Sequence, residues 1–300
     1  MNSEIPHEVR LKDCVVSSNR VAEFEMEGPS LLILREELQQ FRGQKVLKVT
    51  GNTKQPKESL THSTLQRIDT WGKQLFLTFS SSARSAPPII TKTHFLMFGS
   101  YRINEPKPER SPRLELKFRN GVVYFYACSI QFGADVYFEA LDRRVDLMSD
   151  RWDEAHVVDL MGQKQGAFLC DLFLDQNVFA GSGNIVKNEV LFNIRRHPLT
   201  KLAHVPRRDW SRVAQAVHEY CWNFYVWKKQ FQLRRHWQVY RRIQCPLCNS
   251  KLVTESLGKF ARRTFYCPSD QALLPRARKL VVFPVLSVEG LDQQETRLEH

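Results

Sequence analysis

Four residues near the end of the chain have the types and spacing of a metal site. Cys245 and Cys248 are separated by two residues, and Cys267 and Asp270 repeat this spacing after eighteen intervening residues. Two such turns at the ends of a hairpin bring four ligands around one tetrahedral ion, so the pattern predicts a structural zinc site. The carboxylate oxygen of Asp is a harder ligand than a thiolate and binds zinc less strongly, so His236 is an alternative fourth ligand. The competing interpretation is a zinc-free hairpin with unliganded cysteines.

A glycine-rich turn in the middle of the chain could bind an anion. Gly181 and Gly183 allow a tight backbone turn, and Asn184 can cap the helix that follows. The free N–H groups at the N-terminus of such a helix are able to receive a phosphate. On its own, this short pattern is also typical of an ordinary helix cap.

Positive charge is concentrated around the cysteine pairs. Residues 201–280 contain seventeen Lys or Arg and only four acidic residues, whereas the whole chain has a net charge of +12. The excess includes Lys259, Arg262 and Arg263, which the cysteine spacing places at the tip of the hairpin. A localised basic surface of this kind indicates a polyanionic partner, although a solvated basic face is the simpler interpretation.

The sequence around the glycine turn resembles a known family of DNA repair enzymes. Residues 175–189, continuing into Arg196-His197-Pro198, are similar to the helix-two-turns-helix signature of the formamidopyrimidine-DNA glycosylase and endonuclease VIII family. Fifteen residues of this pattern, followed by a cysteine hairpin, are much more specific than a lone helix cap.

Three further segments match in the order that the family has. Residues 26–29 (Met-Glu-Gly-Pro) resemble the N-terminal Pro-Glu-Gly-Pro motif, with Glu27 at the catalytic carboxylate. Lys73 resembles the β-hairpin lysine of the endonuclease VIII branch. Residues 239–241, together with Arg262, resemble the zinc-finger arm whose arginine holds the phosphate at the lesion. The resemblance covers residues 26–271.

This resemblance implies a bifunctional DNA glycosylase and AP lyase of base excision repair, acting on damaged double-stranded or single-stranded DNA. Met26 would supply the amine that attacks C1′ and forms a Schiff base, Glu27 would handle protons on the opened sugar, and Lys73 would donate a proton or contact a phosphate. The strand would then be nicked by elimination. The residues implied to bind DNA are Asn184, Lys187, Arg262 and Met97. Met97 would fill the space left by the extruded base, unless it is a core methionine on a strand.

Two positions depart from the family pattern. Twenty-five residues precede Met26, which replaces the usual proline. While they are attached, the Met26 nitrogen is an amide and cannot act as a nucleophile. Either translation begins at Met26, or the leader is clipped, or this route is lost; we expect residues 1–25 not to belong to the native enzyme. Residues 130–133 (Ile-Gln-Phe-Gly) stand where the 8-oxoguanine branch has Arg-Arg-Phe-Gly, which favours oxidised pyrimidines or ring-opened purines as substrates.

The hydrophobic pattern predicts the elements that hold these residues. Residues 68–79, 89–103 and the hairpin 113–126 around Asn120-Gly121 read as strands, and residues 30–41 as a helix. Helices are expected at 167–176, 184–195, 210–224 and 226–235. The predicted fold is therefore α+β: an N-terminal β-sandwich or barrel with a flanking helix (26–150), a helix-two-turns-helix domain (151–243) and a zinc-finger-like β-hairpin (244–272). Residues 1–25 form a leader and 273–300 a tail.

Composition limits the remaining possibilities. The apolar runs are far shorter than the roughly 20 residues of a membrane span, and the N-terminal segment lacks the apolar centre of a secretory signal. Seven cysteines, an odd number, argue against a disulfide framework, so a cytoplasmic or, in a eukaryote, nuclear protein is expected. A monomer is the default. The alternative functions are a lesion- or single-strand-DNA-binding protein that keeps the fold without the chemistry, and an RNA-binding zinc-ribbon protein.

Overall fold

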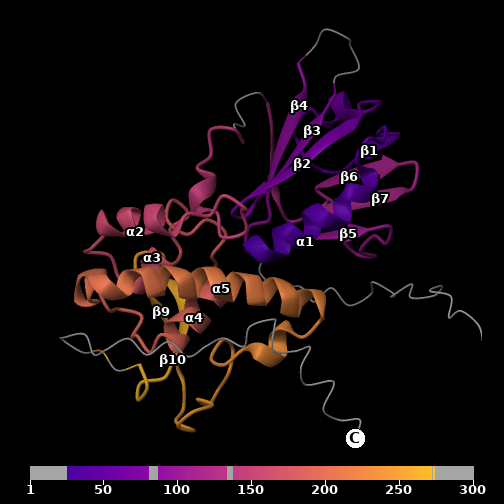
Figure 1. Cartoon of the computed structure of the whole chain (residues 1–300). Coiled ribbons are helices and arrows are strands. Elements are labelled where there is room, and N and C mark those ends of the chain that lie inside the picture. The colour runs from indigo at the N-terminus through magenta and orange to yellow at the C-terminus, as the bar shows by residue number, and fades with distance from the viewer. Residues whose placement is uncertain (1–25, 81–86, 134–137, 272, 274–300) are drawn as a thin grey trace, which may run out of the picture.

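The computed structural model of the chain describes residues 26–80, 87–133, 138–271 and 273, so the predicted leader and almost all of the predicted tail lie outside the described residues. A β-sandwich and a group of helices lie side by side, with helix α1 (Gly28–Leu38) between the sandwich and the long helix α5 (Trp210–Lys229) (Figure 1). The α+β fold class predicted from the sequence is confirmed.

The sandwich consists of two antiparallel four-stranded sheets. One sheet has the order β1-β6-β7-β5 and the other β2-β3-β4-β8. β6 and β7 form the hairpin that the sequence predicts, but Phe118 pairs with Gly121, so the turn residues are Arg119 and Asn120 and not Asn120 and Gly121. The strands are β1 (Lys48–Thr50), β2 (Leu65–Trp71), β3 (Gln74–Phe79), β4 (Ile89–His94), β5 (Ser100–Ile103), β6 (Leu114–Phe118), β7 (Gly121–Tyr126) and β8 (Ser129–Phe132).

The β-rich run at residues 89–103 forms two strands that belong to different sheets. The chain leaves β4 after His94, turns through residues 95–99 and enters the other sheet as β5. Gly99 is needed in this turn because a Cβ there would lie 1.8 Å from the carbonyl oxygen of Phe95. Met97 therefore lies in an exposed turn and not on a core strand, which removes one of its two interpretations.

The helical part differs from the sequence prediction in two places. The two helices predicted at 210–224 and 226–235 are one helix, α5, followed by a short 3-10 turn at Leu233–His236; no Gly or Pro interrupts the pattern between them. The helix predicted at 167–176 is reduced to α3 (Leu169–Leu172). The other helices are α2 (Glu154–Gly162) and α4 (Asn184–Asn193), with 3-10 turns at Gln39–Phe41, Lys57–Leu60, Arg143–Val145, Leu202–His204 and Arg207–Asp209.

Helix α1 joins the two parts because it contributes to both apolar cores. Leu31, Leu34 and Leu38 pack in the core of the sandwich, whereas Leu32 belongs to the core of the helical part. Within the ranges described above, each helix is too short or too polar to cross a membrane. The C-terminal hairpin of β9 (Val253–Leu257) and β10 (Arg262–Tyr266) packs against α4.

Candidate active site

A cavity of about 540 Å³ opens between the sandwich and the helical part. It brings together residues that are far apart in the sequence and that come from the start of α1, the β2–β3 turn, the β4–β5 turn, the start of α4 and the C-terminal hairpin. The lining residues are Met26, Glu27, Lys73, His94, Leu96, Met97, Leu174, Gly183, Asn184, Phe260 and Arg262. Six of the seven residues predicted to act on DNA line this cavity.

Glu27 lines the cavity and binds the N-terminus of α4. Its carboxylate accepts hydrogen bonds from the backbone N–H groups of Gly183 (3.1 Å), Ile185 (2.7 Å) and Val186 (3.3 Å). The side chain is 1% exposed. The helix N-terminus and three N–H donors stabilise the ionised form of such a group.

This arrangement corrects the predicted role of Asn184 as the helix cap. The N-cap position is Gly183, and the capping oxygens belong to Glu27, more than 150 residues earlier in the chain. The Oδ1 atom of Asn184 is buried and, among the residues that the structure describes, has no hydrogen-bond partner. Asn184 lines the cavity and its Oδ1 atom can still accept a hydrogen bond, so its contact with DNA stays a prediction.

Gly183 is required because the Glu27 carboxyl group occupies the space of a side chain. A Cβ built at Gly183 would lie 2.4 Å from the carboxyl carbon of Glu27. We expect Gly183→Ala to displace this carboxylate and to lower the free energy of unfolding by about 1 to 3 kcal/mol, because it overfills a packed site and breaks hydrogen bonds. Urea unfolding measures the change. Gly166→Ala is the control, since nothing lies within 4 Å of its added Cβ; equal effects of the two variants would contradict the packing argument.

Lys73 lines the same cavity and contacts the glycine turn. Its Nζ donates to the carbonyl oxygen of Ser182 at 2.9 Å, and Gly72 supplies the positive φ of 55° that the tight β2–β3 turn needs. The buried carboxyl group of Asp146 accepts the backbone N–H of Gly72, and burial raises the pKa of Asp146 to about 6. Asp146 therefore fixes the turn that carries Lys73.

His94 is a cavity residue that the sequence prediction missed. Burial, and then the positive charges of Lys73 and Lys92, lower the pKa of His94, which favours the neutral ring. Its Nδ1 accepts the backbone N–H of Leu96 at 3.0 Å, so the neutral ring carries its proton on Nε2. In the sequence, the one indication of this role is that His94 lies directly before the segment that contains Met97.

The structure places Lys187 away from the cavity, which argues against the predicted contact with DNA. The side chain has 0% exposure, and its Nζ donates to Thr264 Oγ1 at 2.8 Å and to the carbonyl oxygen of Arg263 at 3.3 Å. The neighbouring Asn188 accepts the backbone N–H of Phe265 at 2.8 Å. Both residues hold β10, and with it Arg262, against α4.

A second anchor holds the tip of the hairpin, and the sequence prediction did not include it. The carboxylate of Asp171 on α3 accepts the backbone N–H groups of Lys259 (3.1 Å) and Phe260 (3.4 Å). Gly258 must be glycine at this point, because its Cβ would lie 2.3 Å from Asp171 Oδ1. The tip, whose Phe260 lines the cavity, is therefore fixed in place.

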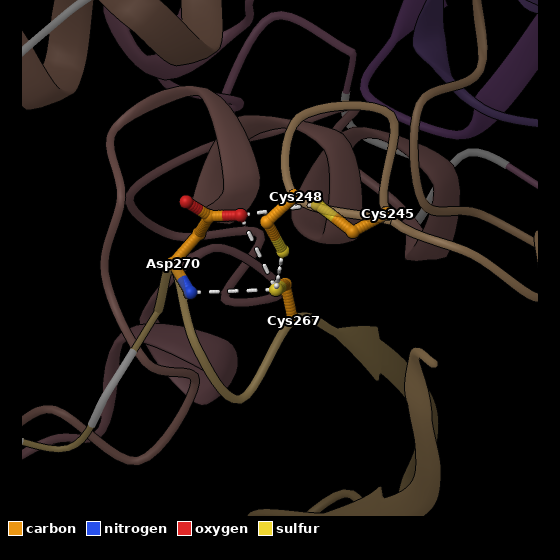
Figure 2. A group of neighbouring side chains, drawn as sticks. All are labelled: Cys245, Cys248, Cys267 and Asp270. Carbon is orange, nitrogen blue, oxygen red and sulfur yellow. Dashed lines mark hydrogen bonds between the residues drawn. The ribbon is translucent and has the colours of Figure 1, made fainter. Parts of the chain in front are cut away.

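The four predicted metal ligands meet at the base of the hairpin (Figure 2). One ligand atom from each of Cys245, Cys248, Cys267 and Asp270 lies within 4.8 Å of the others. The Cys248 and Cys267 sulfurs are 3.5 Å apart, close to the roughly 3.8 Å that a tetrahedral zinc–thiolate site sets. This cluster could hold a metal ion. His236 instead stacks on Trp227, with ring centroids 4.1 Å apart, so Asp270 is the better fourth ligand.

Comparison with known proteins shows the fold and supports the family resemblance. Two solved structures have the same fold: a viral DNA glycosylase (TM-score 0.71, 20% identity, 82% of this chain and 99% of that chain) and the formamidopyrimidine-DNA glycosylase of Lactococcus lactis bound to DNA with an AP site (TM-score 0.67, 21% identity, 82% and 100%). The fold is thus that of DNA glycosylases. The family model of the formamidopyrimidine-DNA glycosylase N-terminal domain matches residues 26–134.

Two curated relatives belong to the endonuclease VIII branch. Endonuclease 8-like 3 of Mus musculus is 28% identical over 74% of this chain and 37% of its own length, and Endonuclease 8-like 2 of Bos taurus is 33% identical over 60% of this chain and 57% of its own length. The chain therefore spans little more than a third of the first relative. These findings support the resemblance to the formamidopyrimidine-DNA glycosylase and endonuclease VIII family that the sequence motifs indicate.

Proposed function

We propose that this protein is a DNA glycosylase with AP lyase activity that removes oxidised bases from DNA. The observation that carries the proposal is the cavity that Glu27, Lys73, Asn184 and Arg262 line together with Met26. These residues come from four distant parts of the chain, and an amine, a carboxylate and phosphate-binding groups are what such chemistry needs.

The proposed reaction begins at the Met26 nitrogen, once no residue precedes it. Its lone pair attacks C1′ of the damaged nucleotide, the N-glycosidic bond breaks, and the base leaves with the bonding electrons and a proton. Opening of the sugar then gives a protonated Schiff base. Loss of a proton from C2′ expels the 3′ phosphate and nicks the strand.

Glu27 suits the proton transfers of this sequence. A carboxylate held ionised at a helix N-terminus balances the positive charge on the Schiff base and can accept a proton from the sugar. Lys73, 2.9 Å from the Ser182 carbonyl oxygen, can donate a proton or bind a phosphate. Arg262 and Asn184 would hold the backbone on either side of the extruded nucleotide.

The proposed preference for a type of lesion rests on Ile130 and Gln131, which stand where the 8-oxoguanine branch has two arginines. Ile130 is buried on β8, and Gln131 is the exposed residue that follows it. A neutral amide in place of two cations favours oxidised pyrimidines or ring-opened purines, which is the preference the sequence indicates.

We infer that the cluster at the base of the hairpin binds a structural zinc ion. Three thiolates and one carboxylate supply the four ligands of a tetrahedral site. The guanidinium of Arg195 holds the other carboxylate oxygen of Asp270 at 2.9 Å, which orients this ligand. A bound ion would tie residues 245–248 to residues 267–270 and keep the hairpin rigid. No step of the reaction passes through this ion.

We expect the protein to contain one zinc ion per chain. Asp270→Ala should weaken zinc binding by more than the about 10- to 100-fold that follows when a hydrogen-bond partner of a metal ligand is removed. Asp270→Cys should retain the ion, because thiolate is the softer ligand. Elemental analysis after dialysis against a chelator measures both. Asp159→Ala, at an exposed position on α2, is the control. Wild-type protein without zinc, or zinc retained in Asp270→Ala, would contradict the assignment.

A gel assay separates this function from that of a DNA-binding protein without chemistry. Protein starting at Met26 is incubated with oligonucleotides that contain thymine glycol, a ring-opened purine or an abasic site, and the products are run under denaturing and native conditions. The enzyme nicks the lesion strand, whereas a pure binder shifts the DNA and leaves it intact. A shift without nicking on every lesion would favour the alternative.

A further inference from the structure

Lys228, in the last turn of helix α5, is a partly buried lysine that the proposed reaction does not use. Its Nζ donates to Ser30 Oγ at 2.6 Å and lies 5.9 Å from the centre of the Phe224 ring. Ser30 is 1% exposed, so this end of the lysine side chain lies in the contact between α1 and α5. Removing an ammonium group from water is costly unless an anion compensates its charge, so a carboxylate is expected nearby.

Two carboxylates, one at each end of helix α1, act on this ammonium group. Burial lowers the pKa of Lys228 to about 8, and the negative charges of Glu27 and then of Glu37 oppose this change. The ammonium form therefore still dominates at pH 7. Burial raises the pKa of Glu37, whose carboxyl group also forms a hydrogen bond with the hydroxyl of Tyr101. The stronger charge pairing of Lys228 is thus with Glu27, the carboxylate of the candidate active site.

Two other titratable groups of α5 near Glu27 are neutral at pH 7. Burial raises the pKa of Tyr220 and that of Cys221 well above their ordinary values, and the charge of Glu27 adds to both effects. Lys73, which lines the cavity with Glu27, comes from the β2–β3 turn and not from α5. The positive charge that α5 presents to Glu27 is therefore that of Lys228.

Lys228 is also connected to the backbone that carries Glu27. The backbone N–H of Ser30, whose hydroxyl accepts the lysine, donates to the carbonyl oxygen of Glu27 at 2.9 Å. The N–H of Gly28 donates to the carbonyl oxygen of Gly181 at 2.8 Å. The first turn of α1, which begins directly after Glu27, is thus held by α5 and by the glycine turn.

We propose that Lys228 is a positioning residue, which holds the first turn of α1 through Ser30 and favours the ionised form of Glu27 through its charge. An opposite charge at short range favours an ionised carboxylate. The residues that line the cavity do not include Lys228, so it acts through Glu27 and not on the DNA. The proposal rests on the proposed function, in which the ionised carboxylate accepts a proton from the sugar.

The first test measures single-turnover nicking of an abasic duplex, as a function of pH, by protein that begins at Met26. The ratio of the variant rate to the wild-type rate removes the titration of the amine, which both proteins share. For Lys228→Met this ratio should fall about tenfold towards acid pH, because protonation of Glu27 then extends about one pH unit higher. Lys228→Arg keeps the charge and should restore the ratio. Affinity for a duplex with a tetrahydrofuran abasic analogue should stay unchanged in both variants.

Two matched variants separate the charge from the hydrogen bond. Ser30→Ala removes the hydroxyl acceptor but leaves the ammonium group, so its ratio should fall by the same factor at every pH. Lys229→Met removes an equal charge at the next, exposed position of α5, where Nζ binds Glu36 Oε2 at 3.0 Å, and its ratio should stay near one. A pH-independent ratio for Lys228→Met, or the same pH dependence in Lys229→Met, would overturn the proposal.

A second test measures the charge pairing without DNA. In urea unfolding of the full chain, Lys228→Met should shift the midpoint less in Glu27→Gln protein than in wild type, because the partner charge is already absent. Equal shifts in the two backgrounds would show that Lys228 and Glu27 are independent, which contradicts the proposal. Because this measurement involves neither binding nor cleavage, a failure of the charge pairing is distinct from a failure of the proposed nicking activity.

Discussion

Glu27→Gln protein is expected to bind lesion-containing duplex nearly as tightly as wild type, yet to release the base and nick the strand about 10²- to 10⁴-fold more slowly. Glutamine keeps one oxygen for the N–H groups of Gly183, Ile185 and Val186, but it cannot accept a proton or balance the charge of a Schiff base. Its free energy of unfolding should fall by about 1 to 3 kcal/mol, since charge-assisted hydrogen bonds are lost.

The chain offers a matched control on the same helix. Glu189 is also fully buried, and its carboxylate accepts the backbone N–H groups of Gln238 (2.9 Å), Val239 (3.0 Å) and Tyr240 (2.7 Å). Burial raises the pKa of Glu189 to about 7, so the protonated form of Glu189 is already populated near neutral pH. Glutamine resembles this protonated form. Single-turnover rates with excess enzyme should stay near wild type for Glu189→Gln. If Glu27→Gln abolished binding as well as nicking, Glu27 would be a structural residue.

Local signals in the sequence predicted much of the fold. The alternating residues on either side of Asn120-Gly121 predicted the β6–β7 hairpin, because strand pattern and turn residues are both local properties, although the strands pair one residue away from the register that an Asn120-Gly121 turn implies. The same holds for α1 and for the spacing of Cys245 and Cys248. The division of the β-rich run 89–103 into β4 and β5 was not visible in the sequence, because it depends on distant contacts: the two halves of the run pair with different sheets.

The candidate site shows the same division between local and distant causes. The glycines before Asn184 indicated a helix start, but no local pattern could show that Glu27 supplies the cap from the other end of the fold. Lys187 illustrates the opposite error: a basic residue within a DNA-binding motif suggested a phosphate contact, whereas its ammonium is buried against Thr264. Charge indicates the kind of partner, and packing decides which cations reach it.

Protein that begins at Met26 is expected to be trapped covalently on abasic DNA by borohydride, whereas the chain with residues 1–25 attached is expected to give no trapped product. A free α-amine has a pKa of about 7.7 to 8.0, so a useful fraction is neutral and nucleophilic at pH 7. In the longer chain the same nitrogen is an amide with a delocalised lone pair. Denaturing gels of the borohydride-reduced complexes measure the difference, and acetylation of the Met26 amine is the matched control.

The position of the trapped DNA decides between this amine and a lysine. Lys228 is the strongest rival, because burial lowers its pKa to about 8 and its amine is neutral more often than that of an ordinary lysine. Its Nζ, however, donates to Ser30 Oγ at 2.6 Å, and the residues that line the cavity do not include it. Peptide mapping of the reduced adduct should therefore find the sugar on Met26. An adduct on Lys228 or Lys73, formed equally well with residues 1–25 attached, would show that a side-chain amine performs the attack.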